Sequence, residues 1–127
     1  MLQRTAILVI DDDPNLRETL ALIFDQAGYR VSVADCGAAG LECLQKQVHA
    51  LVFLDIKMPD RDGTALLPEI RQLYPNLPVL ILTAHVASEA DQEIWDKHAS
   101  GCLTKPVDPA CILERVRALC PPCVSDS

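Results

Sequence analysis

The chain has 127 residues, of which 50% are hydrophobic and 23% are charged. This length and apolar content fit one compact domain with a full core and leave little room for a second domain. Eighteen acidic residues against eleven basic ones give a net charge of −7, so the whole-chain field would repel nucleic acid and anionic membranes. We therefore expect no direct nucleic-acid binding by this chain.

The apolar run at residues 6–10 stops at three aspartates, which is not the pattern of a secretory leader. No uncharged run approaches the roughly 18–20 residues that cross a bilayer. These features predict a soluble protein, cytoplasmic if bacterial, without a membrane segment. With an ample core and no leader, we expect reduced, buried or half-buried thiols rather than disulfides. The cysteines are Cys36, Cys43, Cys102, Cys111, Cys120 and Cys123.

Five short β-branched or aliphatic runs alternate with longer amphipathic segments. The runs cover residues 6–10, 30–34, 50–54, 78–82 and 101–104. Three of them are nearly continuous in apolar residues, which is typical of strands covered on both faces of a parallel sheet. Apolar residues at helical spacing lie between the runs. The alternation predicts an open α/β sheet whose ligands gather at the carboxyl ends of the strands.

Three aspartates follow the first predicted strand directly. Asp13 precedes a proline and is typical of a helix N-cap, whereas Asp11 and Asp12 have no such role. Asp55 ends the third predicted strand, which neighbours the first in a doubly wound sheet. Converging carboxylates repel one another unless they hold a cation or take up a proton, and hard oxygen ligands favour Mg²⁺, or Mn²⁺ in its place. Solvated loop acids are the alternative.

Two further polar side chains follow the last two predicted strands. Thr83 comes after the fourth strand and Lys105 after the fifth. A hydroxyl and an ammonium group at the same sheet edge as a metal-bound carboxylate would form a pocket for a phosphoryl group.

The motifs "ILVIDDDP", "LDIKMPDRDG", "LTA" and "LTKP", in this order and at these separations, resemble the receiver domain of two-component response regulators. The resemblance covers about residues 5–119, and the joint occurrence of the motifs is specific where a single one would not be. It implies a flavodoxin-like (βα)5 doubly wound sandwich with a parallel sheet in the order 2-1-3-4-5. We expect this domain to occupy residues 1–120, with residues 121–127 as a tail or the start of a linker.

The resemblance also implies residue roles. Asp55 matches the phospho-accepting aspartate, and Asp12 and Asp11 match metal-binding acids, with Asp11 usually acting through water. Lys57 stands where the family supplies a metal-binding backbone carbonyl. Thr83 and Lys105 match the groups that contact the phosphoryl group, and the peptide bond from Lys105 to Pro106 is implied to be cis.

The implied partners are a sensor histidine kinase or a phosphotransfer protein, which donates a phosphoryl group from a phosphohistidine to Asp55. The domain would act as a phosphoacceptor with slow autodephosphorylation and not as an enzyme in its own right. An output domain, a partner protein or a homodimer would read the switch. The sequence leaves open which of these applies, and also whether the domain belongs to a hybrid kinase.

The sequence departs from the family at Cys102, where the family commonly has Tyr or Phe. We expect a small buried side chain there, with a redox-sensing thiol as the alternative. His85 and Lys57 occupy variable positions that often tune the lifetime of the phosphoryl group in this family. His98, near the end of the predicted fourth helix, stands where the family often has glycine, and we expect a different local turn there.

Three other features are ambiguous. Trp95 is interpreted as packing at the base of the fourth helix, with a partner contact as the alternative. His49 has no cysteine or acid at ligand spacing and is expected at the surface. Cys120 and Cys123 form a C-x-x-C pattern with two prolines between them, which is more typical of a tail than of a redox or zinc motif.

Two other functional classes compete with this interpretation. "DRDGT" matches the nucleophile motif of haloacid-dehalogenase-type phosphatases, in which Asp60 and Asp62 would be catalytic, but Pro59 disfavours the strand that this motif needs. We instead expect Pro59, Asp60, Asp62 and Gly63 to form the turn into the third helix. A pseudo-receiver that binds proteins without phosphorylation is the other alternative.

Overall fold

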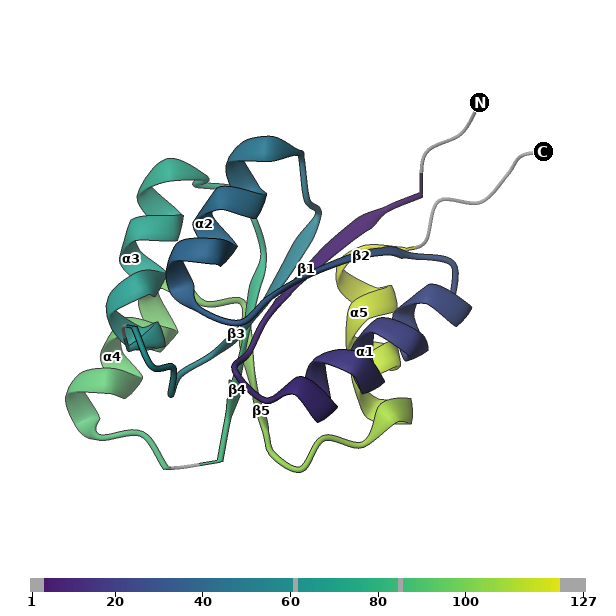
Figure 1. The fold of residues 1–127 in the computed structure, drawn as a ribbon. Coiled ribbons are helices and arrows are strands. Elements are labelled where there is room, and N and C mark those ends of the chain that lie inside the picture. The colour runs from purple at the N-terminus through teal and green to yellow at the C-terminus, as the bar shows by residue number, and fades with distance from the viewer. Residues whose placement is uncertain (1–3, 61, 85, 122–127) are drawn as a thin grey trace.

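The computed structural model describes residues 4–60, 62–84 and 86–121. Strands and helices alternate along the chain, as Figure 1 shows. The strands are β1 (Ala6–Ile10), β2 (Arg30–Ala34), β3 (Leu51–Asp55), β4 (Val79–Thr83) and β5 (Gly101–Thr104). The helices are α1 (Pro14–Gln26), α2 (Gly37–Lys46), α3 (Gly63–Leu73), α4 (Glu89–His98) and α5 (Pro109–Leu119).

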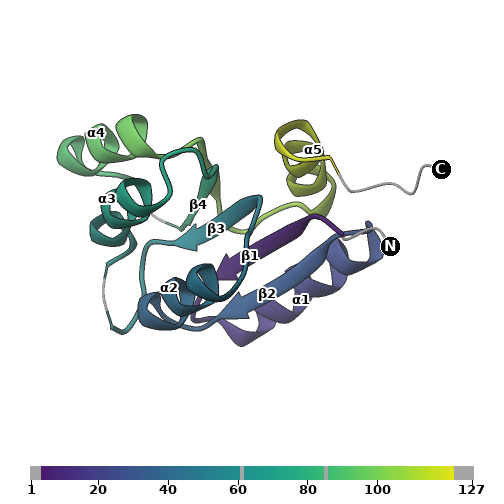
Figure 2. The ribbon, with the colours of Figure 1, turned by 90° about the horizontal axis from the view of Figure 1, so that it is seen from above.

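The strands form one parallel sheet in the order β2-β1-β3-β4-β5, which confirms the predicted flavodoxin-like doubly wound fold. Figure 2 shows β1, β2 and β3 pointing in the same direction. β1, β3 and β4 are buried along their whole length, as their continuous apolar runs predict. β3 and β4 begin and end one residue later than predicted, so Asp55 and Thr83 are the last residues of their strands.

The core has two halves, one on each face of the sheet. Helices α2, α3 and α4 cover one face, and α1 and α5 cover the other (Figure 1). Alternate residues of β1 point to opposite faces, so Leu8 joins the first half and Ile7 the second. In the second half, the rings of Phe24 and Phe53 stack with centroids 5.3 Å apart. Because the strands are parallel, all of them present their carboxyl ends at one edge of the sheet.

Local capping explains where several helices begin. Asp13 precedes Pro14 and accepts the backbone N–H of Asn15 at 3.0 Å, which confirms its predicted N-cap role in α1. Asp62 caps α3 in the same way by accepting the N–H of Thr64 at 2.8 Å. These short acids are structural.

Three sequence predictions about individual side chains are wrong. His49 is buried, with 6% of its surface exposed, because it packs beside Ser32 and Gln47, and its Nε2 lies 3.2 Å from a polar atom of each. Cys102 and Cys111 are exposed, since β5 is an edge strand and Cys111 lies on the outer face of α5. By contrast, the expectation of a buried thiol is confirmed for Cys120, which directly follows α5 and packs on the α1 and α5 side of the core.

The described cysteines are free thiols, and Cys123 lies outside the described residues. Burial raises the pKa of Cys120 to about 11, so this thiol stays protonated at neutral pH. No helix among the described residues is long and apolar enough to cross a membrane.

Candidate functional site

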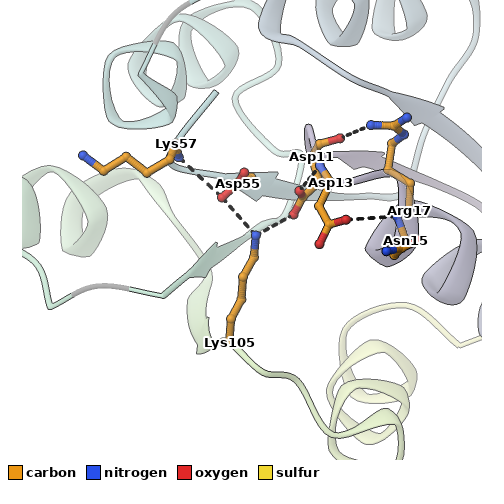
Figure 3. Close-up of polar contacts among 7 residues, drawn as sticks. All are labelled: Asp11, Asp13, Asn15, Arg17, Asp55, Lys57 and Lys105. Carbon is orange, nitrogen blue, oxygen red and sulfur yellow. Dashed lines mark hydrogen bonds and ion pairs between the residues drawn. The ribbon is translucent and has the colours of Figure 1, made fainter. Parts of the chain in front are cut away.

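The carboxyl ends of β1 and β3 bring two buried aspartates together. Asp11 directly follows β1, and its side chain is fully buried; Asp55 is the last residue of β3 and is 4% exposed. Strand pairing between β1 and β3 places these positions at the same sheet edge. The predicted convergence of the two acids is therefore present (Figure 3).

Lys105, which follows β5, reaches across this edge to both acids. Its Nζ lies 2.9 Å from Oδ2 of Asp11 and 3.3 Å from Oδ1 of Asp55 (Figure 3). Its peptide bond to Pro106 is cis, and its backbone N–H donates to the carbonyl of Thr83 at 2.7 Å. The end of β4 thus helps to fix the start of the loop that carries the ammonium group.

The electrostatics of the site follow from this geometry. Burial, assisted by the charge of Asp11, raises the pKa of Asp55 to about 6, and Lys105 opposes this shift. Burial alone would lower the pKa of Lys105, but its contacts with Asp11 and Asp55 more than offset burial and raise that pKa. Lys105 therefore stays a charged ammonium group, whereas Asp55 takes up a proton more readily than an ordinary aspartate does.

Asp12 completes a group of three acids. One carboxylate oxygen from each of Asp11, Asp12 and Asp55 lies within 4.8 Å of the other two, and Asp12 is the exposed member. Oδ2 of Asp11 is buried and contacts Lys105 only as an ion pair, without a hydrogen bond of good geometry among the described residues. Three hard oxygen atoms, one of them lacking a hydrogen bond, fit a Mg²⁺ or Mn²⁺ ion.

Asp13 and Arg17 hold Asp11 in place through contacts that the sequence interpretation did not predict. Its Oδ1 accepts the backbone N–H of Asp13 at 2.9 Å, and its carbonyl oxygen accepts from the Arg17 guanidinium group at 2.8 Å (Figure 3). The spacing from Asp11 to Asp13 is that of an Asx turn, which could have indicated the first contact. The Arg17 contact has no comparable local signal.

The remaining predicted site residues that the structure describes lie at or after the carboxyl ends of β3 and β4. Thr83 ends β4 and is 4% exposed. The Lys57 side chain is exposed and extends away from Asp55 in Figure 3, while its backbone N–H lies 3.4 Å from Oδ1 of Asp55. Pro59 lies in the bend before α3. Gly63 packs against the site, since a Cβ there would come within 2.3 Å of the Asp55 carbonyl oxygen. His85 lies outside the described residues.

The geometry contradicts the phosphatase alternative based on Asp60 and Asp62. Neither residue ends a strand, and Asp62 is occupied as the N-cap of α3. Asp60 accepts the backbone N–H groups of Gly37 and Ala38, each at 3.0 Å, and so caps α2 from a distance in sequence. The N-cap residue of α2, Cys36, makes no side-chain cap bond, which explains why an external acid is used. Sequence spacing gave no sign of this contact.

Two departures from the family pattern have structural outcomes. Although Cys102 is exposed, partial burial of its thiol raises the pKa, against the opposing effect of Arg115, so the redox alternative gains no support from an activated thiolate. His98 ends α4, and its carbonyl oxygen accepts two bonds from the Arg71 guanidinium group, at 2.6 and 3.1 Å. Trp95 is 5% exposed, which confirms the packing interpretation.

Together, the doubly wound parallel sheet and the acids and lysine at its carboxyl edge define a flavodoxin-like α/β domain with a candidate cation and phosphoryl site. The sequence profile of the response regulator receiver domain matches residues 7–117, and the chain belongs to this family. Membership implies two-component phosphorelay signalling through a regulatory phosphoacceptor domain. Receiver domains bind Mg²⁺ through acidic residues, and the aspartate cluster described above is in keeping with this.

Several similar proteins are much longer than this chain. The transcriptional regulatory protein GlrR of Escherichia coli is 39% identical over 102 residues, and the DNA-binding transcriptional regulator NtrC of the same species is 37% identical over 107 residues. These matches cover 80% and 84% of this chain but only 23% of each relative. A 14.6 kDa protein of Leptolyngbya boryana is 34% identical over 88% of its own length.

Solved structures give the same result for the fold. A CheY-like receiver domain protein from Methanospirillum hungatei superimposes with a TM-score of 0.85 at 30% identity, covering 90% of this chain and 91% of that one. The response regulator TrrA of Thermotoga maritima, solved in complex with Mg²⁺ and BeF, has a TM-score of 0.81 at 31% identity, covering 91% and 98%.

Proposed function

We propose that this domain accepts a phosphoryl group on the carboxylate of Asp55, in a Mg²⁺-dependent reaction, from a phosphohistidine of a sensor kinase or phosphotransfer protein. The observation that supports this most is the grouping of Asp55, Asp11 and Lys105 at one sheet edge, with Lys105 Nζ within 3.3 Å of both acids. A buried carboxylate flanked by an acid cluster and a fixed ammonium group is suited to meet a phosphoryl group.

The proposed transfer is a direct displacement at phosphorus. An Asp55 carboxylate oxygen forms the new P–O bond while the P–N bond to the donor imidazole breaks. The imidazole leaves with the bonding electron pair and takes up a proton, and Asp55 becomes an acyl phosphate. Hydrolysis of that acyl phosphate by water in the same site, with slow release of inorganic phosphate, would return Asp55 without making the domain an enzyme for an external substrate.

The other residues have separate roles in this proposal. Lys105 would neutralise charge on the transferred group and Thr83 would donate a hydrogen bond to it. Asp11, Asp12, Asp55 and the backbone carbonyl of Lys57 would hold the ion. When bound, Mg²⁺ or Mn²⁺ would offset the repulsion between the carboxylates and the incoming phosphate. Lys57 and His85 would tune the lifetime of the acyl phosphate.

The extent of the domain and its readout are part of the same proposal. Residues 1–120 form the receiver unit, and residues 121–127 form a tail or the start of a linker. Since this chain spans 23% of the length of GlrR and NtrC, an output domain on the same polypeptide is one proposed reader of the switch, and a partner protein or homodimer is another. A cytoplasmic location would give access to the donor histidine.

The test uses beryllofluoride as the phosphoryl probe. We expect it to bind with one-to-one stoichiometry only when Mg²⁺ or Mn²⁺ is present, and Asp55→Asn should abolish binding. Asp60→Asn is the matched control, because Asp60 is a nearby acid that caps α2, and this variant should bind as the wild type does. Absence of Asp55-dependent binding in a folded wild-type protein would favour the pseudo-receiver instead.

A further inference from the structure

A buried hydrogen bond joins α4 to the first turn of α3. Trp95, the only tryptophan of the chain, donates from its indole Nε1 to the hydroxyl oxygen of Thr64 at 2.9 Å. Both residues are at least nine-tenths buried, with 5% and 6% of their surfaces exposed. Because neither polar group can easily turn to water, breaking this bond within the folded protein leaves a donor and an acceptor unsatisfied.

The first turn of α3 is in turn fixed against the loop that carries Asp55. The backbone N–H of Gly63 donates to the carbonyl of Ile56 at 2.8 Å. The approach is so close that a Cβ at Gly63 would lie 2.3 Å from the Asp55 carbonyl oxygen and 2.9 Å from Cα of Ile56. A shift of the backbone at Asp55 or Ile56 therefore moves Gly63 and the neighbouring Thr64 as well.

Trp95 also lines two cavities. One, of about 160 Å³, is lined by Trp95 together with Ile56 and Thr83 from the carboxyl edge of the sheet. The other, of about 280 Å³, is lined by Trp95 with Gln92 and Cys102 on the α4 and β5 side. Trp95 therefore borders both the carboxyl edge of the sheet and the surface between α4 and β5.

We propose that Trp95 and Thr64 form the coupling element through which a phosphoryl group on Asp55 repositions α4. This inference rests on the proposed function of Asp55. A phosphoryl group changes the contacts of the loop after β3, Gly63 and Thr64 follow this loop, and the indole hydrogen bond carries the displacement to Trp95. The Trp95 ring then moves with Thr64, and α4 moves with the ring relative to Cys102 on β5.

The two side chains are positioning residues in this scheme, since neither contacts the Asp55 carboxylate. Their roles can be separated by conservative variants. Trp95→Phe keeps an aromatic ring but removes the N–H donor, and Thr64→Val keeps the shape of the side chain but removes the acceptor. Thr64→Ser restores a hydroxyl group and serves as the rescue variant. Leu73→Ala, at an exposed position on α3, serves as the matched control.

The experiment is a ¹H–¹⁵N titration of each protein with Mg²⁺ and beryllofluoride. In the wild type we expect the single indole N–H signal and the amides of α4 and Cys102 to shift on binding. In Trp95→Phe and Thr64→Val, amides around Asp55 and Lys105 should still shift fully, while the shifts in α4 should fall to roughly half or less. Thr64→Ser and Leu73→Ala should behave as the wild type does.

The outcomes distinguish the coupling from the function on which it rests. Failure of beryllofluoride to shift the Asp55 region of the wild type would refute the proposed function. Full shifts near Asp55 with undiminished shifts in α4 for both Trp95→Phe and Thr64→Val would refute the coupling alone. If one variant unfolds, the other decides, because each removes the same bond from a different side. A stationary wild-type indole signal during full binding would also overturn the coupling.

Discussion

The carboxylate of Asp60 provides a sharp test of how the loop before α3 is used. It accepts the backbone N–H groups of Gly37 and Ala38 at 3.0 Å each, where α2 begins and where Cys36 supplies no side-chain cap. Asp60→Ala would leave these two N–H groups to water and remove a negative charge from the positive end of the helix dipole. We expect the protein to be less stable but still folded.

The magnitude follows from the geometry of this cap. Loss of a helix N-cap costs typically about 1 kcal/mol, and an exposed charge at a helix N-terminus contributes about 0.3–1 kcal/mol more. We therefore expect the free energy of unfolding to fall by about 1–2 kcal/mol, or the melting temperature by roughly 3–8 °C for a domain of this size. Urea denaturation and calorimetry measure these two quantities.

The control is Asp35→Ala, which removes another exposed acid near the start of α2. Asp35 has no side-chain hydrogen bond or ion pair with the described residues, so its loss should change stability by less than about 0.5 kcal/mol. Asp60→Ala should also retain phosphoryl uptake, because Asp60 lies outside the acid cluster. Equal stability of the two variants would refute the capping role, and loss of uptake only in Asp60→Ala would revive the phosphatase reading.

Three further predictions concern residues with well-defined surroundings. Gly63→Ala should destabilise the fold by about 1–3 kcal/mol, measured by urea denaturation, because its Cβ would meet the backbone at Asp55; unchanged stability would show that this backbone yields freely. The guanidinium group of Arg71 binds the carbonyl oxygens of His98 and Leu77. Arg71→Met should therefore lower the free energy of unfolding by about 2–3 kcal/mol in the same assay and speed hydrogen exchange of the α4 amides. Unchanged exchange in α4 would contradict this. Burial lowers the pKa of His49 below its ordinary 6.5, so its contribution to stability is complete above pH 6.5 and is lost as pH falls toward the lower folded-state value. His49→Gln should remove this pH dependence of the free energy of unfolding, measured by urea denaturation at several pH values. Parallel pH profiles of stability for the variant and the wild type would refute the prediction.

The sheet was predictable because its signals are local and periodic. The continuous apolar runs of β1, β3 and β4 indicated buried parallel strands, and each run lay within one residue of the observed strand. Acids placed directly after strands had to meet at the carboxyl edge of such a sheet, which is why Asp11 and Asp55 were found from spacing. Asp13 and Asp62 carried ordinary capping signals.

What sequence reasoning missed depends on contacts between distant segments. His49 is buried beside Ser32 on the edge strand β2, and the cap that Asp60 provides for α2 spans 23 positions in the chain. The hydrogen bond between Trp95 and Thr64 spans 31 positions. Local composition indicates whether a residue suits a turn or a core, but it does not show which distant backbone group the residue will reach.

For Cys102, sequence reasoning predicted burial where the structure shows exposure. A small, weakly polar residue in a predicted strand was expected to be buried, but the order of the sheet places β5 at an edge, and the thiol is exposed there. Burial of an apolar strand residue depends on whether a helix or another strand covers that face. The alternation of elements alone does not tell how completely the last strand is covered.

The most direct test of the account is to map a transferred phosphoryl group to its residue. The protein would be incubated with Mg²⁺ and a small-molecule phosphodonor, and the acyl phosphate would be trapped by borohydride reduction and located by peptide mass spectrometry. We predict one modification, on Asp55, that is absent without a divalent cation and absent in Asp55→Asn. A modification on Asp60 or Asp62, or none in the folded wild-type protein, would contradict the account.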